Sequence, residues 1–131
     1  MSIDQRNAFK RGAAMFEVEF YRKSDGSAPA KDFIDTLDTK MKAKMLRLID
    51  MLEQNGNDLR EPYSAILGNG IFELRAKQGS NITRVLYFFV VGKKIILTNG
   101  FVKKTVKTPR SEIELAEKYK LSYERRELSN E

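Results

Sequence analysis

Alternation of apolar and polar residues near the start of the chain predicts its first strand. Residues 16–21 read Phe-Glu-Val-Glu-Phe-Tyr, and this period of two is typical of a half-buried strand. The side chains expected to face the core are Phe16, Val18 and Phe20. Residues 1–14 are polar and aperiodic, so we expect a flexible N-terminal extension followed by one folded domain over residues 15–131.

Two helices are predicted after the first strand from apolar residues at helical spacing. Pro29 suits the first turn of a helix, and residues 30–37 carry apolar side chains at helical spacing. Asp38 or Thr39 is suited to cap a second helix that runs to about Gln54. One face of this second helix is apolar, which indicates packing in the core; its residues are Met41, Met45, Leu48, Ile49 and Leu52.

Further strands are predicted in the second half of the chain, after a connection over residues 57–67. Residues 71–77 alternate, with Phe72, Leu74 and Ala76 on one face and, on the other, Glu73, Arg75 and Lys77. Residues 82–91 are too apolar for a half-exposed strand, so we place them centrally in the sheet. Residues 94–99 predict another strand, after which Gly100 permits a bend or a close backbone approach.

A final helix is predicted at the C-terminal end. Thr108 is a suitable N-cap, with Pro109 at the first helical position. Apolar residues recur at helical spacing up to about residue 120. Together the elements indicate an α+β domain with a mainly antiparallel sheet of about four strands.

Positive charge is concentrated in one segment of the chain. The chain has 24 basic and 18 acidic residues, and residues 71–110 hold nine of the basic ones but a single acid, Glu73. This segment therefore carries eight net positive charges, whereas the whole chain carries +6. A cluster of cations with so little counter-charge is what a polyanion site needs, so we expect a nucleic-acid partner.

The composition also excludes several kinds of chemistry. The chain has no histidine and no cysteine, so Ser–His and Cys–His catalysis is excluded and the usual zinc ligands are missing. We therefore expect neither a metal nor a cofactor. The lack of cysteine suits a reducing compartment, and no apolar run approaches the roughly 20 residues of a membrane span. A cytoplasmic protein is expected.

The basic residues suggest a phosphate clamp. Adjacent antiparallel strands would bring Arg75, Arg84 and the lysines at the end of the last strand onto one concave surface, where arginine binds phosphate in a bidentate manner and lysine acts as a point charge. Arg75 and Arg84 are suited to stabilise the charge that develops when a 2′-hydroxyl attacks the adjacent phosphate. Tyr87 is a candidate for stacking on bases.

Each candidate has a structural alternative. Arg75 could pair with Glu73, Arg84 could cap a strand end, and Tyr87 could belong to the core with its hydroxyl hydrogen-bonded. Lys103 and Lys104 could form a solvated edge that deters aggregation.

The chain resembles the phage-derived HigB-like branch of the RelE/ParE toxin superfamily over about residues 16–119. The resemblance rests on the ELR strand, the R-x-L-Y-F strand and the GF-x-KK-T-x-K-TP junction. It implies a RelE-like, microbial ribonuclease-like fold in which a helical hairpin packs on the sheet. It also implies the toxin of a type II toxin–antitoxin pair, a metal-independent endoribonuclease (mRNA interferase) that cuts translated mRNA on the ribosome. A helix-turn-helix, HigA-like antitoxin would be its partner.

By motif, the resemblance maps the family's functional basic positions onto Arg75, Arg84, Lys103 and Lys104, with Lys77 a weaker match. Together with the reading of the basic face, this predicts catalytic roles for Arg75, Arg84 and Lys104. It predicts RNA contacts for the remaining candidates, which are Lys77, Tyr87, Lys103, Lys107 and Arg110. Two other functions remain open on the same scaffold: a ParE-like gyrase inhibitor and an RNA-binding module without catalysis.

Overall fold

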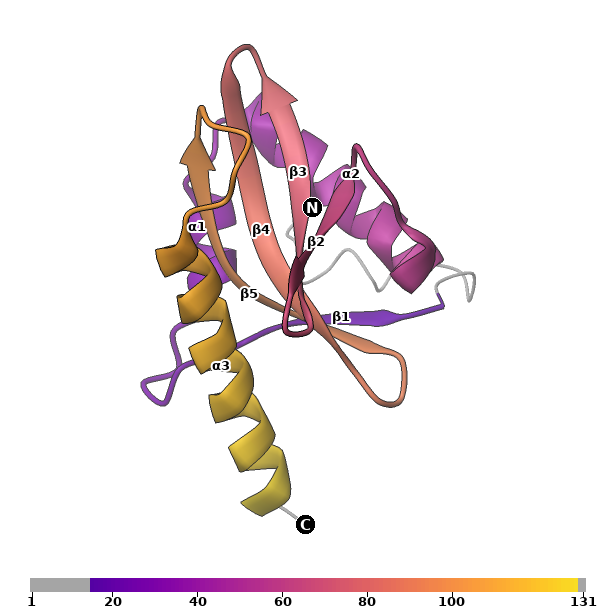
Figure 1. Cartoon of the computed structure of the whole chain (residues 1–131), viewed down its shortest axis with the longest axis vertical. Helices are drawn as coiled ribbons and strands as arrows, with labels where there is room; N and C mark the ends of the chain where they lie inside the picture. Colours follow the sequence, from indigo (N-terminus) through magenta and orange to yellow (C-terminus); the bar gives the residue numbers. More distant parts are fainter. Residues whose placement is uncertain (1–14, 130–131) are drawn as a thin grey trace.

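The computed structural model describes residues 15–129, so the expected extension over residues 1–14 lies outside the described residues. The chain builds a mixed α+β domain in which the strands form one sheet (Figure 1). The elements in chain order are β1 (Glu17–Phe20), α1 (Pro29–Asp35), α2 (Thr39–Asn55), the 3-10 turn η2 (Gly56–Asp58), β2 (Ser64–Gly68), β3 (Ile71–Gln78), β4 (Asn81–Val90), β5 (Lys94–Lys103) and α3 (Arg110–Ser129).

The sheet has the strand order β1-β5-β4-β3-β2. β1 runs parallel to β5, and all other neighbours are antiparallel. The apolar strand β4 lies at the centre of the sheet, which confirms its predicted place. The sheet has five strands where the sequence predicted about four, because β2 forms inside the segment expected to be a connection. β2 pairs with β3 from Ser64 opposite Leu74 to Gly68 opposite Ile71.

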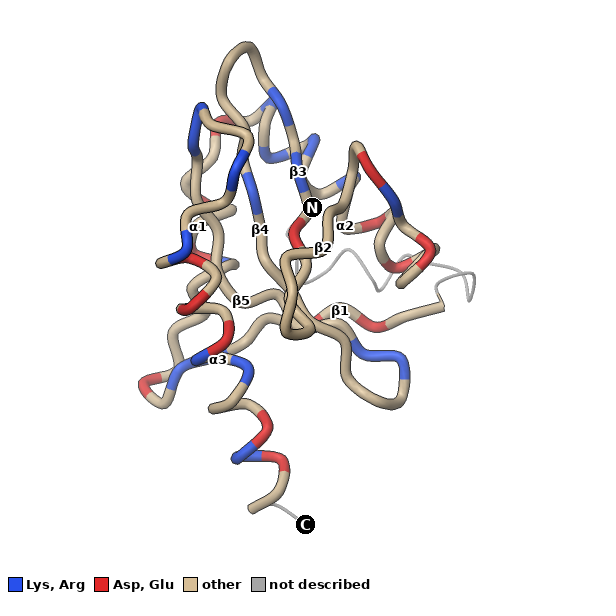
Figure 2. Tube along the Cα trace, viewed as in Figure 1, with Lys and Arg blue, Asp and Glu red and all other residues tan. Residues whose placement is uncertain are grey.

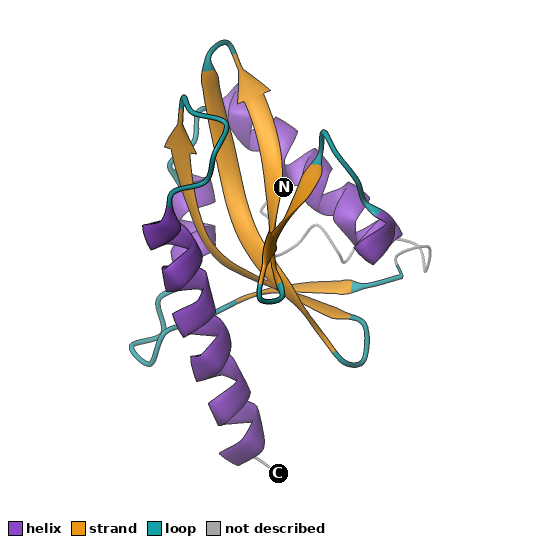
Figure 3. Ribbon diagram, viewed as in Figure 1, coloured by secondary structure: helices purple, strands orange, loops and turns teal. Residues whose placement is uncertain are grey.

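Helices cover both faces of the sheet (Figure 3). α1 and α2 pack on one face, where the predicted apolar residues of β3 meet those of α2 in the larger core cluster. α3 packs on the opposite face through the buried Ala116 and the partly buried Tyr119 and Tyr123. None of the helices in residues 15–129 combines the length and the hydrophobicity that a membrane-spanning segment requires.

Helix boundaries follow local chemistry at α2. Asp38 caps this helix by accepting a hydrogen bond from the Met41 amide at 2.8 Å, as one of the two predicted caps would. The helix ends at Gly56, which adopts a φ of 53°. A Cβ atom there would lie 2.1 Å from the ring of Phe16, so only glycine fits.

β5 and α3 differ from their predicted limits. β5 continues through Gly100 to Lys103, and the β4 register opposite it shifts between Val85 and Tyr87. The predicted close approach occurs at Gly100, where the Phe33 ring packs on the backbone and a Cβ atom would lie 2.3 Å from that ring. α3 begins at Arg110 and continues to Ser129, well beyond residue 120. Thr108 is not its N-cap and Pro109 is not its first residue, because the first hydrogen-bonded amides of the helix, those of Glu112 and Ile113, donate to the Pro109 carbonyl. The Thr108 hydroxyl donates to Glu73 instead.

Candidate functional site

Exposed cations gather at one end of the sheet, seen in the upper half of Figure 2. We call this region the basic end; its residues are Lys77, Lys103, Lys104, Lys107 and Arg110, all of them exposed. Lys77 and Lys103 end β3 and β5, and both are opposite Ile82, from the two sides of β4. Their backbones are therefore two strand spacings apart, roughly 10 Å, which places both lysines on one face.

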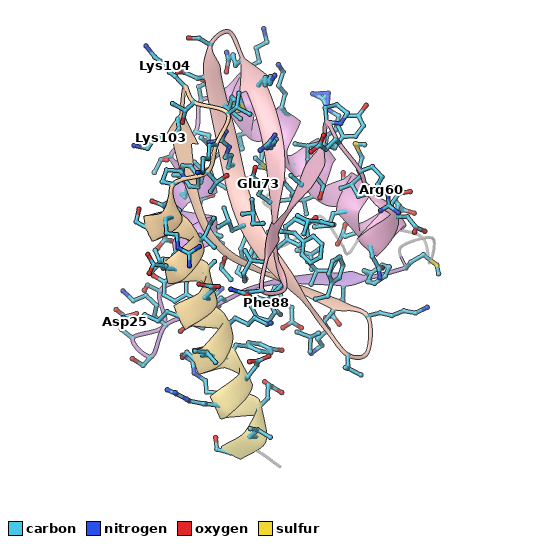
Figure 4. All side chains as sticks on the ribbon, in the orientation of Figure 1. Asp25, Arg60, Glu73, Phe88, Lys103 and Lys104 are labelled. Carbon is cyan, nitrogen blue, oxygen red and sulfur yellow. The ribbon has the colours of Figure 1, made fainter. Side chains whose placement is uncertain are left out.

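The remaining three cations follow β5 in the chain. Lys104 and Lys107 belong to the basic loop, which we define as residues 104–107, and Arg110 is the first residue of α3. Figure 4 shows Lys103 and Lys104 side by side at the end of β5. All the lysines and Arg110 that the sequence assigned to RNA contact therefore lie in one region.

Arg75 and Arg84 meet on the same face of the sheet, as the sequence predicted, because they are directly opposite each other on β3 and β4. Their exposure differs. The Arg75 side chain is 21% exposed, whereas that of Arg84 is 0% exposed. Arg75 can therefore reach a ligand at the surface, while Arg84 lies beneath the basic loop.

Glu73 supplies the counter-charge to this pair. It is 0% exposed, and its Oε2 accepts a hydrogen bond from Arg75 Nε and lies 3.7 Å from Arg84 Nε. Its Oε1 accepts a hydrogen bond from the Thr108 hydroxyl. The structural alternative for Arg75, a pair with Glu73, therefore describes its contact. The one acid of the segment is buried between the two arginines, next to Arg84 as well.

Arg84 holds the basic loop from below. Its Nη2 donates to the carbonyl oxygens of Thr105 and Val106, and Arg75 Nη2 donates to the Val106 carbonyl at 3.2 Å. The guanidinium also lies over the ring of Phe101, 5.7 Å from its centroid. Burial lowers the pKa of Arg84 below its ordinary value, and the negative charge of Glu73 opposes that shift. Arginine nevertheless stays charged in proteins, so Arg84 is a buried cation that fixes the loop.

Tyr87 lies apart from these residues. It is 1% exposed on the face covered by α1 and α2, where its ring stacks on Phe72 with centroids 5.5 Å apart. Its hydroxyl shares a 2.6 Å hydrogen bond with Ser64 Oγ, and burial raises its pKa to about 12. The structure therefore does not bring Tyr87 to the basic end, and the structural alternative of a hydrogen-bonded core tyrosine describes its place.

A pocket of about 380 Å³ opens near the C-terminal end of α2, lined by residues that include Arg60, Ser64, Ile66, Phe72 and Phe89. Arg60 lies on the opposite side of the view from Lys103 and Lys104 in Figure 4. Among residues 15–129, no group of three or more His, Cys, Asp or Glu side chains is arranged to hold a metal ion. The basic end is therefore the region whose chemistry suits a polyanion.

Sequence reasoning offered the pair of Glu73 with Arg75 as an alternative but missed the contacts of Glu73 with Arg84 and Thr108. The signal for Glu73 was present, since it is the single acid in a basic segment. Thr108 gave no such signal, because it stands 35 residues from Glu73 along the chain and only the fold brings the two together.

Comparison with known families gives a match over most of the described chain. Residues 32–120 match the family model described as phage-derived protein Gp49-like (DUF891). The matched segment extends from α1 into α3 and includes the whole basic end. No curated protein matches the chain.

Proposed function

Because the chain belongs to the Gp49-like family of phage-derived proteins, a RelE/ParE-like toxin family of toxin–antitoxin systems, we propose that it is a HigB-like toxin that cuts mRNA on the ribosome. The observation that carries this proposal is the basic end, where exposed cations from β3, β5, the basic loop and α3 share one region. An RNA backbone offers the repeating negative charge that such a surface binds.

The residues divide into groups with different tasks. Lys77, Lys103, Lys107 and Arg110 bind the RNA backbone through exposed side chains. Arg75, which is partly exposed, and Lys104 contact the scissile phosphate. Arg84 is buried beneath the basic loop, so it acts by holding that loop in place.

Cleavage would proceed by attack of the 2′-oxygen on the adjacent phosphorus: the P–O2′ bond forms, the P–O5′ bond breaks, and the proton of the 2′-hydroxyl passes to solvent water. The phosphate gains negative charge as the new bond forms, and the cations of Arg75 and Lys104 stabilise that charge. The ammonium group of Lys104 is also a proton donor for the leaving 5′-oxygen. Because the chain contains no histidine and no cysteine, this assignment relies on arginine and lysine side chains.

A toxin–antitoxin family implies an antitoxin partner. We propose that this partner is a HigA-like protein with a helix-turn-helix domain, and that the targets of the free toxin are the ribosome and its mRNA. Expression of the chain without such a partner is then expected to arrest growth.

Primer extension on a translated message tests the cleavage. We expect new 5′ ends with the wild-type chain when ribosomes are present, and none without them. Lys104→Ala should reduce cleavage about a hundredfold or more, as loss of one transition-state donor does in other enzymes. Lys23→Ala is the matched control, because Lys23 is also an exposed lysine outside helices and strands.

Two results would contradict the proposal. The first is an intact message together with inhibition of DNA gyrase in a supercoiling assay, which would assign the ParE-like activity instead. The second is RNA binding without cleavage, which would leave only an RNA-binding module.

A further inference from the structure

The buried contacts of Glu73 join three separate parts of the chain. Glu73 comes from β3, Arg84 from β4, and Thr108 from the segment that connects the basic loop to α3. We call the four residues Glu73, Arg75, Arg84 and Thr108 the latch. Arg84 and Thr108 are buried, and the Glu73 carboxylate contacts the other three residues.

The latch holds the basic loop at its middle and directly after its last residue. Arg84 and Arg75 donate hydrogen bonds to carbonyl groups of Thr105 and Val106, in the middle of the loop. Thr108, directly after the loop, donates to Glu73. The side chains of Thr105, Val106 and Lys107 are exposed, so burial of apolar surface contributes little to the loop's position. Its conformation therefore depends on these polar contacts.

General energetics argue that the latch has a role beyond stability. Burying the Glu73 carboxylate and the Arg84 guanidinium group costs solvation free energy, which ion pairing often only offsets. Apolar residues would stabilise the same sheet face at lower cost. In some proteins a buried polar network is retained because it selects one conformation, and here the selected conformation is that of the loop that carries Lys104 and Lys107.

We propose that Glu73 and Thr108 are positioning residues, which lock the basic loop so that Lys104 meets the RNA phosphate. This inference rests on the proposed function for the identity of the ligand. Neither residue contacts RNA in this arrangement, since both are buried. They act through the loop. Of the two, Thr108 is the residue that can be substituted without leaving a buried charge unpaired.

Thr108→Val tests the latch with little change in shape. The substitution removes the hydroxyl that donates to Glu73 and keeps the branched side chain. The separate variant Thr108→Ser keeps the hydroxyl and serves as the conservative comparison. Thr98→Val is the matched control: Thr98 is 0% exposed on β5, and its hydroxyl donates to the Leu86 carbonyl at 3.1 Å, away from the loop.

Loop position is measured first without RNA. Limited trypsin digestion of the folded protein cuts after Lys104 only when the loop opens. A hydrogen bond to a charged group is worth enough to change the open population about tenfold. We therefore expect cleavage after Lys104 to be about tenfold faster in Thr108→Val, and close to the wild-type rate in Thr108→Ser and Thr98→Val.

Message cleavage on ribosomes is measured next on the same four proteins. Thr108→Val should cut between about tenfold and a hundredfold more slowly, since small displacements of a catalytic group cost that much. Thr108→Ser should recover most of the activity, and Thr98→Val should cut like the wild type at equal or lower thermal stability. A general loss of stability would affect Thr98→Val as well, so this pattern separates positioning from folding.

The outcomes distinguish the two proposals. If the wild-type chain cuts no message, the proposed function is wrong, whatever the digestion shows. If the wild type cuts and Thr108→Val cuts equally well or faster, or if Thr108→Val is digested no faster after Lys104, the latch is wrong and the proposed function stands.

Discussion

A single carboxylate allows two arginines to face each other in one sheet. Like charges directly opposite on neighbouring strands repel, and Arg75 and Arg84 occupy such positions. Glu73 lies two residues before Arg75 on the same strand face and contacts both cations. Because both arginines pair with Glu73 inside the protein, they are less available to an external anion than the exposed lysines of the basic end.

Tyr87 shows how position on a strand decides a role. We expect Tyr87→Phe to lower the free energy of unfolding by about 1 kcal/mol, because Ser64 loses a buried hydrogen-bond partner. The affinity for RNA should stay unchanged, since the ring lies on the face covered by α1 and α2. Urea denaturation and RNA titration measure the two effects. Lost RNA affinity at unchanged stability would return Tyr87 to the RNA-binding residues.

The same variant should change the alkaline stability. The pKa of Tyr87 is raised by burial from 10.0 to about 12, so the unfolded chain releases the phenol proton at lower pH than the folded chain does. The stability that this group contributes is therefore fully present below pH 10 and lost as the pH rises towards 12. The loss amounts to roughly 2–3 kcal/mol, and Tyr87→Phe should lack this part of the pH dependence.

Among the elements, β5 connects the basic end to the core. It runs from Lys94 to Lys103 beside β4, carries Phe101 under the Arg84 guanidinium, and ends where the basic loop begins. Within this strand, position 100 requires glycine, because Phe33 of helix α1 packs against it and leaves no space for a Cβ atom. The position of the lysines that follow β5 therefore depends on a close contact between β5 and α1.

Gly100→Ala is expected to destabilise the fold by about 1–3 kcal/mol, as overpacking of a core does. The new methyl group would lie 2.3 Å from the Phe33 ring and 3.0 Å from the Arg84 carbonyl oxygen. Thermal denaturation measures the loss. Phe33→Leu in the same chain should relieve part of it, and a double-mutant cycle gives the coupling between the two positions. Purely additive effects would show that the contact with Phe33 is not the cause.

At the scale of the whole molecule, charge is unevenly placed. Exposed cations occupy the end of the sheet where β3 and β5 finish, whereas the pocket beside α2 is lined by aromatic and aliphatic residues together with Arg60, Glu61 and Ser64 (Figures 2 and 4). A small protein with one basic region can orient itself on a polyanion before any specific contact forms. Binding to RNA should then depend on salt.

Salt dependence measures how many cations take part. Each contact with a phosphate of a single strand contributes about −0.7 to the slope of log affinity against log salt. The five exposed cations of the basic end, together with Arg75, therefore predict a slope of up to about −4.2. Lys104→Ala and Lys107→Ala should each reduce its size by about 0.7, and Lys23→Ala should leave it unchanged. A slope near zero, or equal losses from all three variants, would refute the role of the basic end.

Local patterns in the sequence specified most of the elements. The period of two predicted β1 and β3, and the helical period predicted α1 and α2, because these signals arise from which side of an element is buried. A continuous apolar run predicted β4 and its central place. β2 escaped prediction, since a five-residue edge strand after a proline has little pattern of its own. The full length of α3 escaped as well, since few of its residues are buried. The charge imbalance of residues 71–110 indicated the basic segment without any structure.

The sequence by itself determined most of the elements, the central place of β4 and the residue types available for binding an anion. Only the tertiary structure decided which of the cations are free to bind one. Pairing across β3 and β4, and the return of the chain over them at Thr108, enclose Glu73 and Arg84 and leave the lysines outside. The physical reason is that solvation and ion pairing depend on neighbours in space, and the neighbours of Glu73 come from positions 2, 11 and 35 residues away.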